Sequence, residues 1–345
     1  MKTNSRSYFR QFCSFSALLG ICLLNLSADA VTEEHLSKQF TVKAGGTVVV
    51  DVDMGSIEVA TNANGVVAID VLRKIGRSKK ADEESFLKDH PVEFSQEGDK
   101  VTIRCRSKNK ISWSITGKNQ NEVKYTITVP CEYNAQLKTA GGAISVTDLT
   151  GEVKANTSGG GLKFTRLHGP LNGDTSGGGI HVADCEGKLK VQTSGGGITV
   201  NGGSGSLEGE TSGGTIMVKR FQGPASVHSS GGGITLENVT GEIRGETSAG
   251  GIKAALPAPL KGPVKLETSA GGITVELAGS AAFELDAATS AGNVQSELPV
   301  TVSGKHERSS MKGSVNGGGP KMLLRSSAGS IRLVKSGRML AEEPK

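Results

Sequence analysis

The sequence predicts an all-β protein built as a two-sided β-solenoid with coils of 18 residues. One observation is a constant period, in which an apolar anchor follows a run of small residues at every eighteenth position. Another is the alternation of apolar and polar residues after each anchor, which is typical of a half-buried strand. A third is a glycine at a fixed place in each unit, which indicates a corner with positive φ. The anchors are Ile144, Leu162, Ile180, Ile198, Ile216, Ile234 and Ile252.

A fixed period of this length indicates stacked coils, because one unit is too small to bury its own apolar face. Each unit contains two short strands and two corners, one of them a glycine run, three residues long in most units, and the other a single glycine. A helix is disfavoured, since three consecutive glycines would cost about 3 kcal/mol per unit in helix propensity. The single corner glycines are Gly151, Gly169, Gly187, Gly205, Gly223 and Gly241.

A column of hydroxyl residues precedes the glycine runs. In a stack in register, equivalent side chains lie about 4.8 Å apart. We therefore expect these hydroxyls to hydrogen-bond to one another along the ladder. The column is Thr157, Thr175, Thr193, Thr211, Ser229 and Thr247.

Residues 1–30 have the features of a secretory signal peptide. Lys2, Arg6 and Arg10 precede an apolar stretch, and Ala28-Asp-Ala30 fits the cleavage pattern. The apolar stretch is too short for a comfortable membrane span, and a retained anchor helix is the alternative. We expect an exported protein of the periplasm, the outer surface or the extracellular space, without a stable span once the signal is removed.

Residues 31–130 are predicted to form a β-rich region with one short helix near 79–89. We expect this whole region to cover one end of the stack. The segment Gly55-Ser-Ile57-Glu-Val59 resembles the repeat and predicts a first, degenerate coil. Trp113 alternates with Ile111 and Ile115, so we expect it in the core or over an edge. A Trp exposed for stacking on sugars is the alternative.

The solenoid is predicted over 131–335, followed by a disordered tail over 336–345. Beyond Ile252 the period lengthens to 21 residues, at Ile273 and Val294. The interval of 37 residues from Val294 to Ile331 fits two units with one longer loop. Residues 322–333 would supply the final strands.

Three cysteines remain after the signal, and the sequence shows no cysteine framework. Export permits a disulfide, so a bond between Cys105 and Cys131 is left open. Cys185 falls in an inward-facing column and is expected to be a small buried apolar side chain. Removal of residues 1–30 would take the 39 basic residues to 36 and the 34 acidic residues to 33, and the resulting net charge of +3 is too small and too evenly spread to indicate nucleic-acid binding.

The repeat resembles the bacterial "putative adhesin" family, a domain of unknown function. The resemblance rests on Gly151-Glu-Val-Lys-Ala-Asn-Thr-Ser-Gly-Gly160 and its copies, and on Asn316-Gly-Gly-Gly-Pro320 followed by Arg325-Ser-Ser-Ala-Gly-Ser-Ile331. It extends over about residues 40–333. It implies a β-strand-repeat fold and surface adhesion, and it brings no catalytic or binding residues.

One outer column offers a candidate metal site. Glu210, His228 and Glu246 would be successive neighbours, and such a ladder could hold a divalent cation. The alternative is a solvated outer strand with weak charge pairing. No catalytic motif, closely spaced cysteine pair or cofactor motif is present in the sequence, so we predict no catalytic residues and no cofactor.

These features favour a non-catalytic exported solenoid that acts as an adhesin or a binding scaffold of the cell envelope. Its expected partners are envelope polysaccharide or a surface protein, and the oligomeric state is left open. The first alternative is a structural module that assembles with itself or with envelope partners. The second is a glycan-active enzyme, which would need paired carboxylates.

Overall fold

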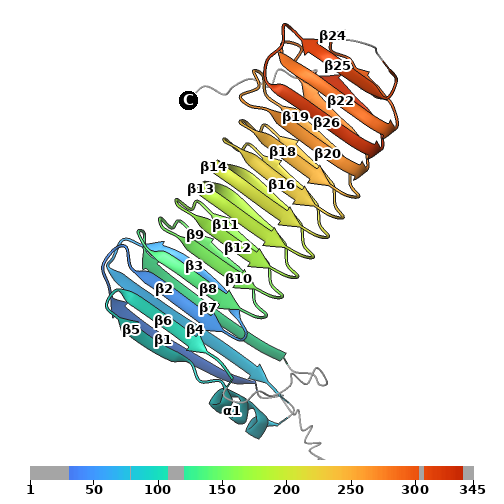
Figure 1. The fold of residues 1–345 in the computed structure, drawn as a ribbon. Helices are drawn as coiled ribbons and strands as arrows, with labels where there is room; N and C mark the ends of the chain where they lie inside the picture. Colours follow the sequence, from blue (N-terminus) through green and yellow to red (C-terminus); the bar gives the residue numbers. More distant parts are fainter. Residues whose placement is uncertain (1–30, 78, 108–119, 303–306, 337–345) are drawn as a thin grey trace, which may run out of the picture.

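The computed structural model describes residues 31–77, 79–107, 120–302 and 307–336. Their strands form a two-walled rod (Figure 1), which confirms the predicted all-β solenoid. The predicted signal peptide (1–30), Trp113 and residues 337–345 of the predicted tail lie outside the described residues. In the part of the chain that is described, no helix has the length and apolar character needed to cross a membrane.

The first wall is a row of parallel strands that pair edge to edge along the rod. In spatial order it contains β6 (Lys100–Cys105), β2 (Thr47–Val52), β8 (Asn134–Thr139), β10 (Val153–Thr157), β12 (Leu171–Thr175), the ends of β13 (Ile180–Thr193) and β14 (Ile198–Thr211), β16 (Ala225–Ser229), β18 (Ile243–Thr247), β20 (Val264–Ala270), β26 (Lys321–Ala328) and β22 (Phe283–Ala291).

The second wall faces the first and is built in the same way. In spatial order it contains β7 (Gln120–Pro130), β3 (Ser56–Asn62), β9 (Ile144–Thr147), β11 (Leu162–Thr165), the beginnings of β13 and β14, β15 (Ile216–Lys219), β17 (Ile234–Glu237), β19 (Ile252–Leu256), β21 (Ile273–Leu277), β27 (Ile331–Lys335) and β23 (Val294–Ser296).

Residues 18 apart lie side by side, as the repeat predicts. Ile180 pairs with Leu162 on one side and with Ile198 on the other. The anchors are buried between the walls, where Val, Leu and Ile side chains from both form one core. Small residues on one wall make room for large ones on the other. A Cβ at Gly173 would lie 2.9 Å from the ring of Phe164, which is fully buried.

The single-glycine corner has positive φ, as predicted. The angle is 136° at Gly169, 129° at Gly187 and 128° at Gly223. A second positive-φ column, which the sequence did not reveal, lies three residues earlier. It includes Asp148 at 62° and Arg166 at 51°, although non-glycine residues seldom adopt this conformation. The two side chains are neighbours, and Arg166 donates two hydrogen bonds to the Asp148 carboxylate, at 2.5 and 2.9 Å.

The hydroxyl column is buried, but its hydrogen bonds differ from those expected. Thr211 Oγ1 donates to the carbonyl of Gly196 at 2.7 Å and accepts from the N–H of Gly214 at 3.2 Å. The hydroxyl thus links its own corner to the corner of the preceding coil rather than to the next hydroxyl. The reason is that the strand ladder stops at the corner, where backbone groups still need partners. The same pair of bonds recurs at Thr157, Thr175, Thr193, Ser229 and Thr247.

The middle glycine of each Gly-Gly-Gly corner is required by close approach of the neighbouring coil. A Cβ on Gly196 would lie 2.1 Å from the carbonyl oxygen of Gly178. The preceding glycine is different, since a Cβ on Gly195 would make ordinary contact at 3.4 Å.

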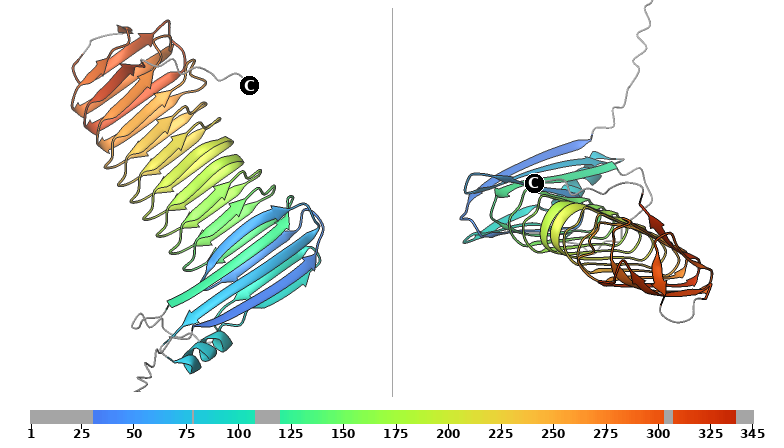
Figure 2. Two further views of the ribbon diagram at one scale, coloured as in Figure 1. Left: turned by 180° about the vertical axis from the view of Figure 1, so that it is seen from behind. Right: turned by 90° about the horizontal axis from the view of Figure 1, so that it is seen from above.

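At the N-terminal end, antiparallel strands cover the open edges of both walls. β4 (Val66–Gly76) pairs with β7, and β1 (Thr32–Thr41) pairs with β4. On the first wall, β5 (Glu93–Glu97) pairs with β6. The predicted helix is α1 (Lys80–Asp89), which lies at this end of the rod (Figure 2). The carboxylate of its buried Glu83 accepts hydrogen bonds from the backbone N–H groups of Thr32 and Arg77, at 3.2 and 2.8 Å.

The β-rich N-terminal region also contributes coils of its own. Ile57 of β3 pairs with Ile144 of β9, and Val48 of β2 pairs with Ala135 of β8. The degenerate coil expected around Ile57 is therefore confirmed. The walls continue through residue 130 without a break.

At the C-terminal end, the stacking does not follow the expected pattern. The last coil, β26 and β27, lies between the coil β20–β21 and the coil β22–β23, so Ile331 pairs with both Ile273 and Val294. The residues between Val294 and Ile331 do not form two coils. They contribute β24 (Val300–Val302) and β25 (Ser310–Val315), which run antiparallel and cover the edge of β22.

The two ends of the chain share this interleaving. The coil β2–β3 lies between the later coils β6–β7 and β8–β9, as β26–β27 lies between two earlier ones. Each of these two coils therefore has a parallel neighbour on both sides. This arrangement protects the coils nearest the chain ends, where solenoids are exposed to fraying.

Replacing Thr211 with Val should lower the free energy of unfolding by about 1–3 kcal/mol, because the Gly196 carbonyl and the Gly214 N–H lose their partner. Urea denaturation followed by circular dichroism would measure the change. Thr211→Ser is the matched control and should stay near the parent, since Ser229 occupies the same column. Equal stability of the Val and Ser variants would contradict this role.

Gly196→Ala should destabilise the stack by about 1–3 kcal/mol, because the added Cβ collides with the backbone of the neighbouring coil. Gly195→Ala adds the same methyl group one residue earlier, where its nearest neighbours lie at van der Waals distance. This variant should change stability by less than about 0.5 kcal/mol. Thermal unfolding of both variants would compare them, and similar losses would show that close approach at position 196 is not the cause.

Candidate functional site

The outer face of the first wall carries a column of exposed serines. In each coil one serine directly follows the buried hydroxyl and therefore points outward. These serines lie at or just beyond the ends of neighbouring strands, whose spacing is about 4.8 Å. We call this set the serine column: Ser158, Ser176, Ser194, Ser212, Ser230, Ser248, Ser269, Ser327 and Ser290.

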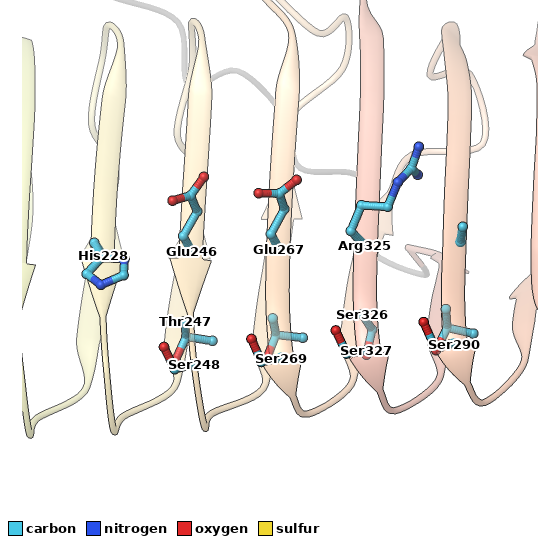
Figure 3. Close-up of a pocket in the computed structure, with 13 residues that line it drawn as sticks. His228, Glu246, Thr247, Ser248, Glu267, Ser269, Ser290, Arg325, Ser326 and Ser327 are labelled. Atoms are coloured by element: carbon cyan, nitrogen blue, oxygen red, sulfur yellow. The ribbon is translucent and has the colours of Figure 1, made fainter.

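A shallow groove of about 480 Å³ lies on this face towards the C-terminal end. It crosses β18, β20, β26 and β22, and Figure 3 shows its serines in one row with charged side chains in the next row. We call it the wall groove. Its lining residues are His228, Glu246, Thr247, Ser248, Glu267, Thr268, Ser269, Ala288, Thr289, Ser290, Arg325, Ser326 and Ser327.

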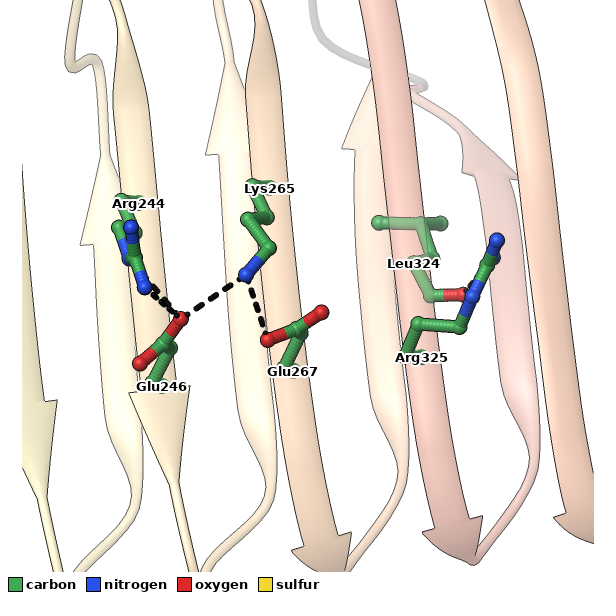
Figure 4. Close-up of polar contacts among 6 residues, drawn as sticks. All are labelled: Arg244, Glu246, Lys265, Glu267, Leu324 and Arg325. Atoms are coloured by element: carbon green, nitrogen blue, oxygen red, sulfur yellow. Dashed lines mark hydrogen bonds and ion pairs between the residues drawn. The ribbon is translucent and has the colours of Figure 1, made fainter.

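Ion pairs organise the charged row (Figure 4). Lys265 bridges two carboxylates, at 3.1 Å to Glu246 and 2.7 Å to Glu267. Arg244 also pairs with Glu246, at 2.8 Å. Partial burial acts to raise the pKa of Glu246, but the hydrogen bond from Lys265 and the nearby positive charges outweigh it and hold the pKa below its usual value. Arg325 donates to the Asp286 carboxylate at 2.8 Å.

The candidate metal residues are brought together only as strand neighbours. His228 pairs with Glu210 on one side and Glu246 on the other. Glu210 accepts a hydrogen bond from Gln192 at 3.2 Å, and Glu246 is held by Arg244 and Lys265. Among the described residues, no three His, Cys, Asp or Glu side chains are close enough to hold a metal ion.

The three cysteines of the described chain are free thiols. Cys105 is buried and Cys131 is exposed, so the bond left open between them is not formed in this structure. Cys185 is buried in its inward column, as expected, and burial raises the pKa of its thiol.

The family model of Toastrack DUF4097 matches residues 49–334, which is most of the chain. The protein belongs to the Toastrack DUF4097 family. This membership confirms the resemblance drawn from the repeat. A comparison of the Toastrack sequence with curated proteins finds no significant match.

Several solved structures are similar to this Toastrack chain. The "putative adhesin" of Bacteroides fragilis is 13% identical, over 87% of this chain and 97% of its own, with a TM-score of 0.37. A "putative adhesin" of Parabacteroides distasonis is 13% identical over 71% and 97%, with a TM-score of 0.40. A "putative lipid binding protein" of the same species is 13% identical over 87% and 97%, with a TM-score of 0.36. At these values the names of those proteins support no statement about what this one binds.

Sequence reasoning missed most of the wall groove. It found the columns that contain Glu246 and Thr247, because these keep the 18-residue period, but it did not single out the exposed serines that follow the buried hydroxyls. It did not place Arg325 and Ser327 between Glu267 and Ala288, because that order depends on the inserted last coil. The shared Thr-Ser or Ser-Ser pair before each corner is the one signal that marks these coils as equivalent.

Lys265→Met should raise the pKa of Glu246 towards its ordinary value of 4.5, because the substitution removes a hydrogen bond and a positive charge. In the parent, the ion pair forms fully above the unfolded-state pKa and is lost as the pH falls through the lower folded-state pKa. NMR titration of the Glu246 side-chain carboxyl would measure this pKa in the parent and in the Lys265→Met variant. Lys253→Met, on the second wall, is the control; an unchanged Glu246 pKa in the Lys265 variant would exclude the bridge.

Proposed function

We propose that this Toastrack protein is a non-catalytic, exported solenoid that presents its first wall as a binding face in the cell envelope. The observation that carries the proposal is the wall itself, where exposed hydroxyl and charged side chains repeat in register coil after coil. A rigid repeated face can meet a repeated partner at many equivalent points. The expected partners are envelope polysaccharide or a surface protein, and the signal-like residues 1–30 supply the argument for export.

The covered ends weigh against end-to-end assembly as the main role. Such assembly needs an open and unprotected strand edge, and β4, β5 and β25 cover terminal strands of the coils. The outermost strand β1 carries Glu33, Glu34 and Lys38, and charges of this kind are typical of edges that avoid pairing.

The ion pairs of the wall groove weigh against a glycan-active enzyme. Glycoside hydrolysis needs one carboxylic acid with a raised pKa to protonate the leaving group. Glu246 and Glu267 share Lys265, and the pKa of Glu246 lies below its usual value. Glu246 is therefore suited to accepting hydrogen bonds rather than to donating a proton.

The test is a binding assay with the purified mature chain against envelope polysaccharide and extracted surface proteins of the source cell. We expect binding that Glu210→Lys, on the first wall, weakens by about tenfold. Glu237→Lys, on the second wall, makes the same charge change and should leave binding within about twofold. Failure to bind either class of partner, or equal effects of the two variants, would refute the first wall as the binding face.

A further inference from the structure

We infer that the wall groove binds a short stretch of neutral polysaccharide that lies along the rod, across the strands. The inference rests on the proposed function and adds to it the place and the chemical class of the ligand. It depends on three features of the groove: uncommitted acceptors, a row of hydroxyls and a balance of charge.

The acceptors are carboxylate oxygens that face no protein donor. Arg244 and Lys265 both bond to Oε1 of Glu246, and Lys265 bonds to Oε2 of Glu267. The second oxygen of each carboxylate accepts no hydrogen bond from any described residue. Lys265 thus holds both carboxylates in place, and hydroxyl groups are good donors to such oxygens.

The hydroxyl row is the part of the serine column within the groove. Ser248, Ser269, Ser327 and Ser290 are exposed, and their hydroxyls bond to no described residue. Each can donate one hydrogen bond and accept others. The spacing of about 4.8 Å from one coil to the next resembles the length of a sugar ring. A polysaccharide along the rod can therefore present a hydroxyl-bearing ring to each serine.

The charges favour a neutral ligand over an acidic or basic one. The cations that contact the groove glutamates or line the groove beside them are already paired: Arg244 and Lys265 with glutamates, and Arg325 with Asp286. An acidic polymer would meet two carboxylates, and Arg325, the one lysine or arginine among the described lining residues, is already paired. A neutral, hydroxyl-rich chain meets no charge repulsion in the groove. Its hydroxyls can hydrogen-bond to both the carboxylates and the serines.

The hollow itself comes from the inserted coil. Arg325 leans towards Asp286, and the next residue in its row is the small Ala288. The resulting volume of about 480 Å³ lies within the usual range for sites that hold small ligands. Further towards the N-terminus, the same row carries Gln192 and Glu210.

The experiment measures binding of the mature chain to soluble neutral glucan, mannan and galactan, with polygalacturonate as the acidic counterpart, by affinity electrophoresis and calorimetry. We expect at least one neutral polymer to bind and polygalacturonate not to bind. Ser269→Ala with Ser327→Ala, and separately Glu267→Gln, should each weaken that binding by about tenfold. Ser176→Ala with Ser194→Ala makes the same change in the serine column outside the groove and should leave binding within about twofold.

All four serines are exposed, so both double variants should unfold at the parent temperature, and this is checked first. Three results overturn the inference: no neutral polymer binds, polygalacturonate binds as well as the neutral polymers, or the two double variants weaken binding equally. If native envelope material still binds while every neutral polymer fails, the groove assignment falls and the proposed function stands. If neither binds, both fall.

Discussion

The structure depends on a hydrogen-bonded link between corners of successive coils. In each repeat a buried hydroxyl, such as that of Thr211, joins the glycine carbonyl of the coil before it to the N–H of its own corner. The link requires the backbones to approach closely, and only glycine allows this at positions such as Gly196. The threonine and glycine of each corner therefore act together, and their repetition along the chain holds the coils at a constant spacing. The constant spacing in turn creates every column on the outer faces.

A stack of equivalent coils has a general problem at its two ends, because an open parallel edge accepts another strand as readily as the correct one. This protein uses two solutions together. Antiparallel strands cover both edges at the N-terminal end and the first-wall edge at the C-terminal end, and the coils nearest the chain ends are inserted one place inward. The insertion at the C-terminal end also shapes the outer face, since it sets Arg325 beside Glu267 and Ala288. The same device that protects the end of the stack therefore builds the wall groove.

The chemistry of the first wall follows from weak, exposed interactions rather than from a buried catalytic centre. Ion pairs such as Lys190 with Glu208 run between neighbouring coils at the surface, where each adds little to stability. Their main effect is to neutralise the wall while leaving carboxylate and hydroxyl oxygens at the surface. A face of this kind is suited to many modest contacts with an extended partner, in which affinity comes from repetition.

The sequence by itself determined the strands, the corners and the inward or outward direction of almost every repeat residue. Direction follows from the period-2 geometry of a strand, which is local, and glycine at position 169 permits the positive φ of the corner without steric cost. Tertiary structure decided which coil stacks on which, what the buried hydroxyls bind, and which residues line the groove. These features are not local, because the coils share one pattern and any coil edge can pair in register with any other. Only the competition among equivalent edges in the folded chain selects Ile331 as the neighbour of both Ile273 and Val294.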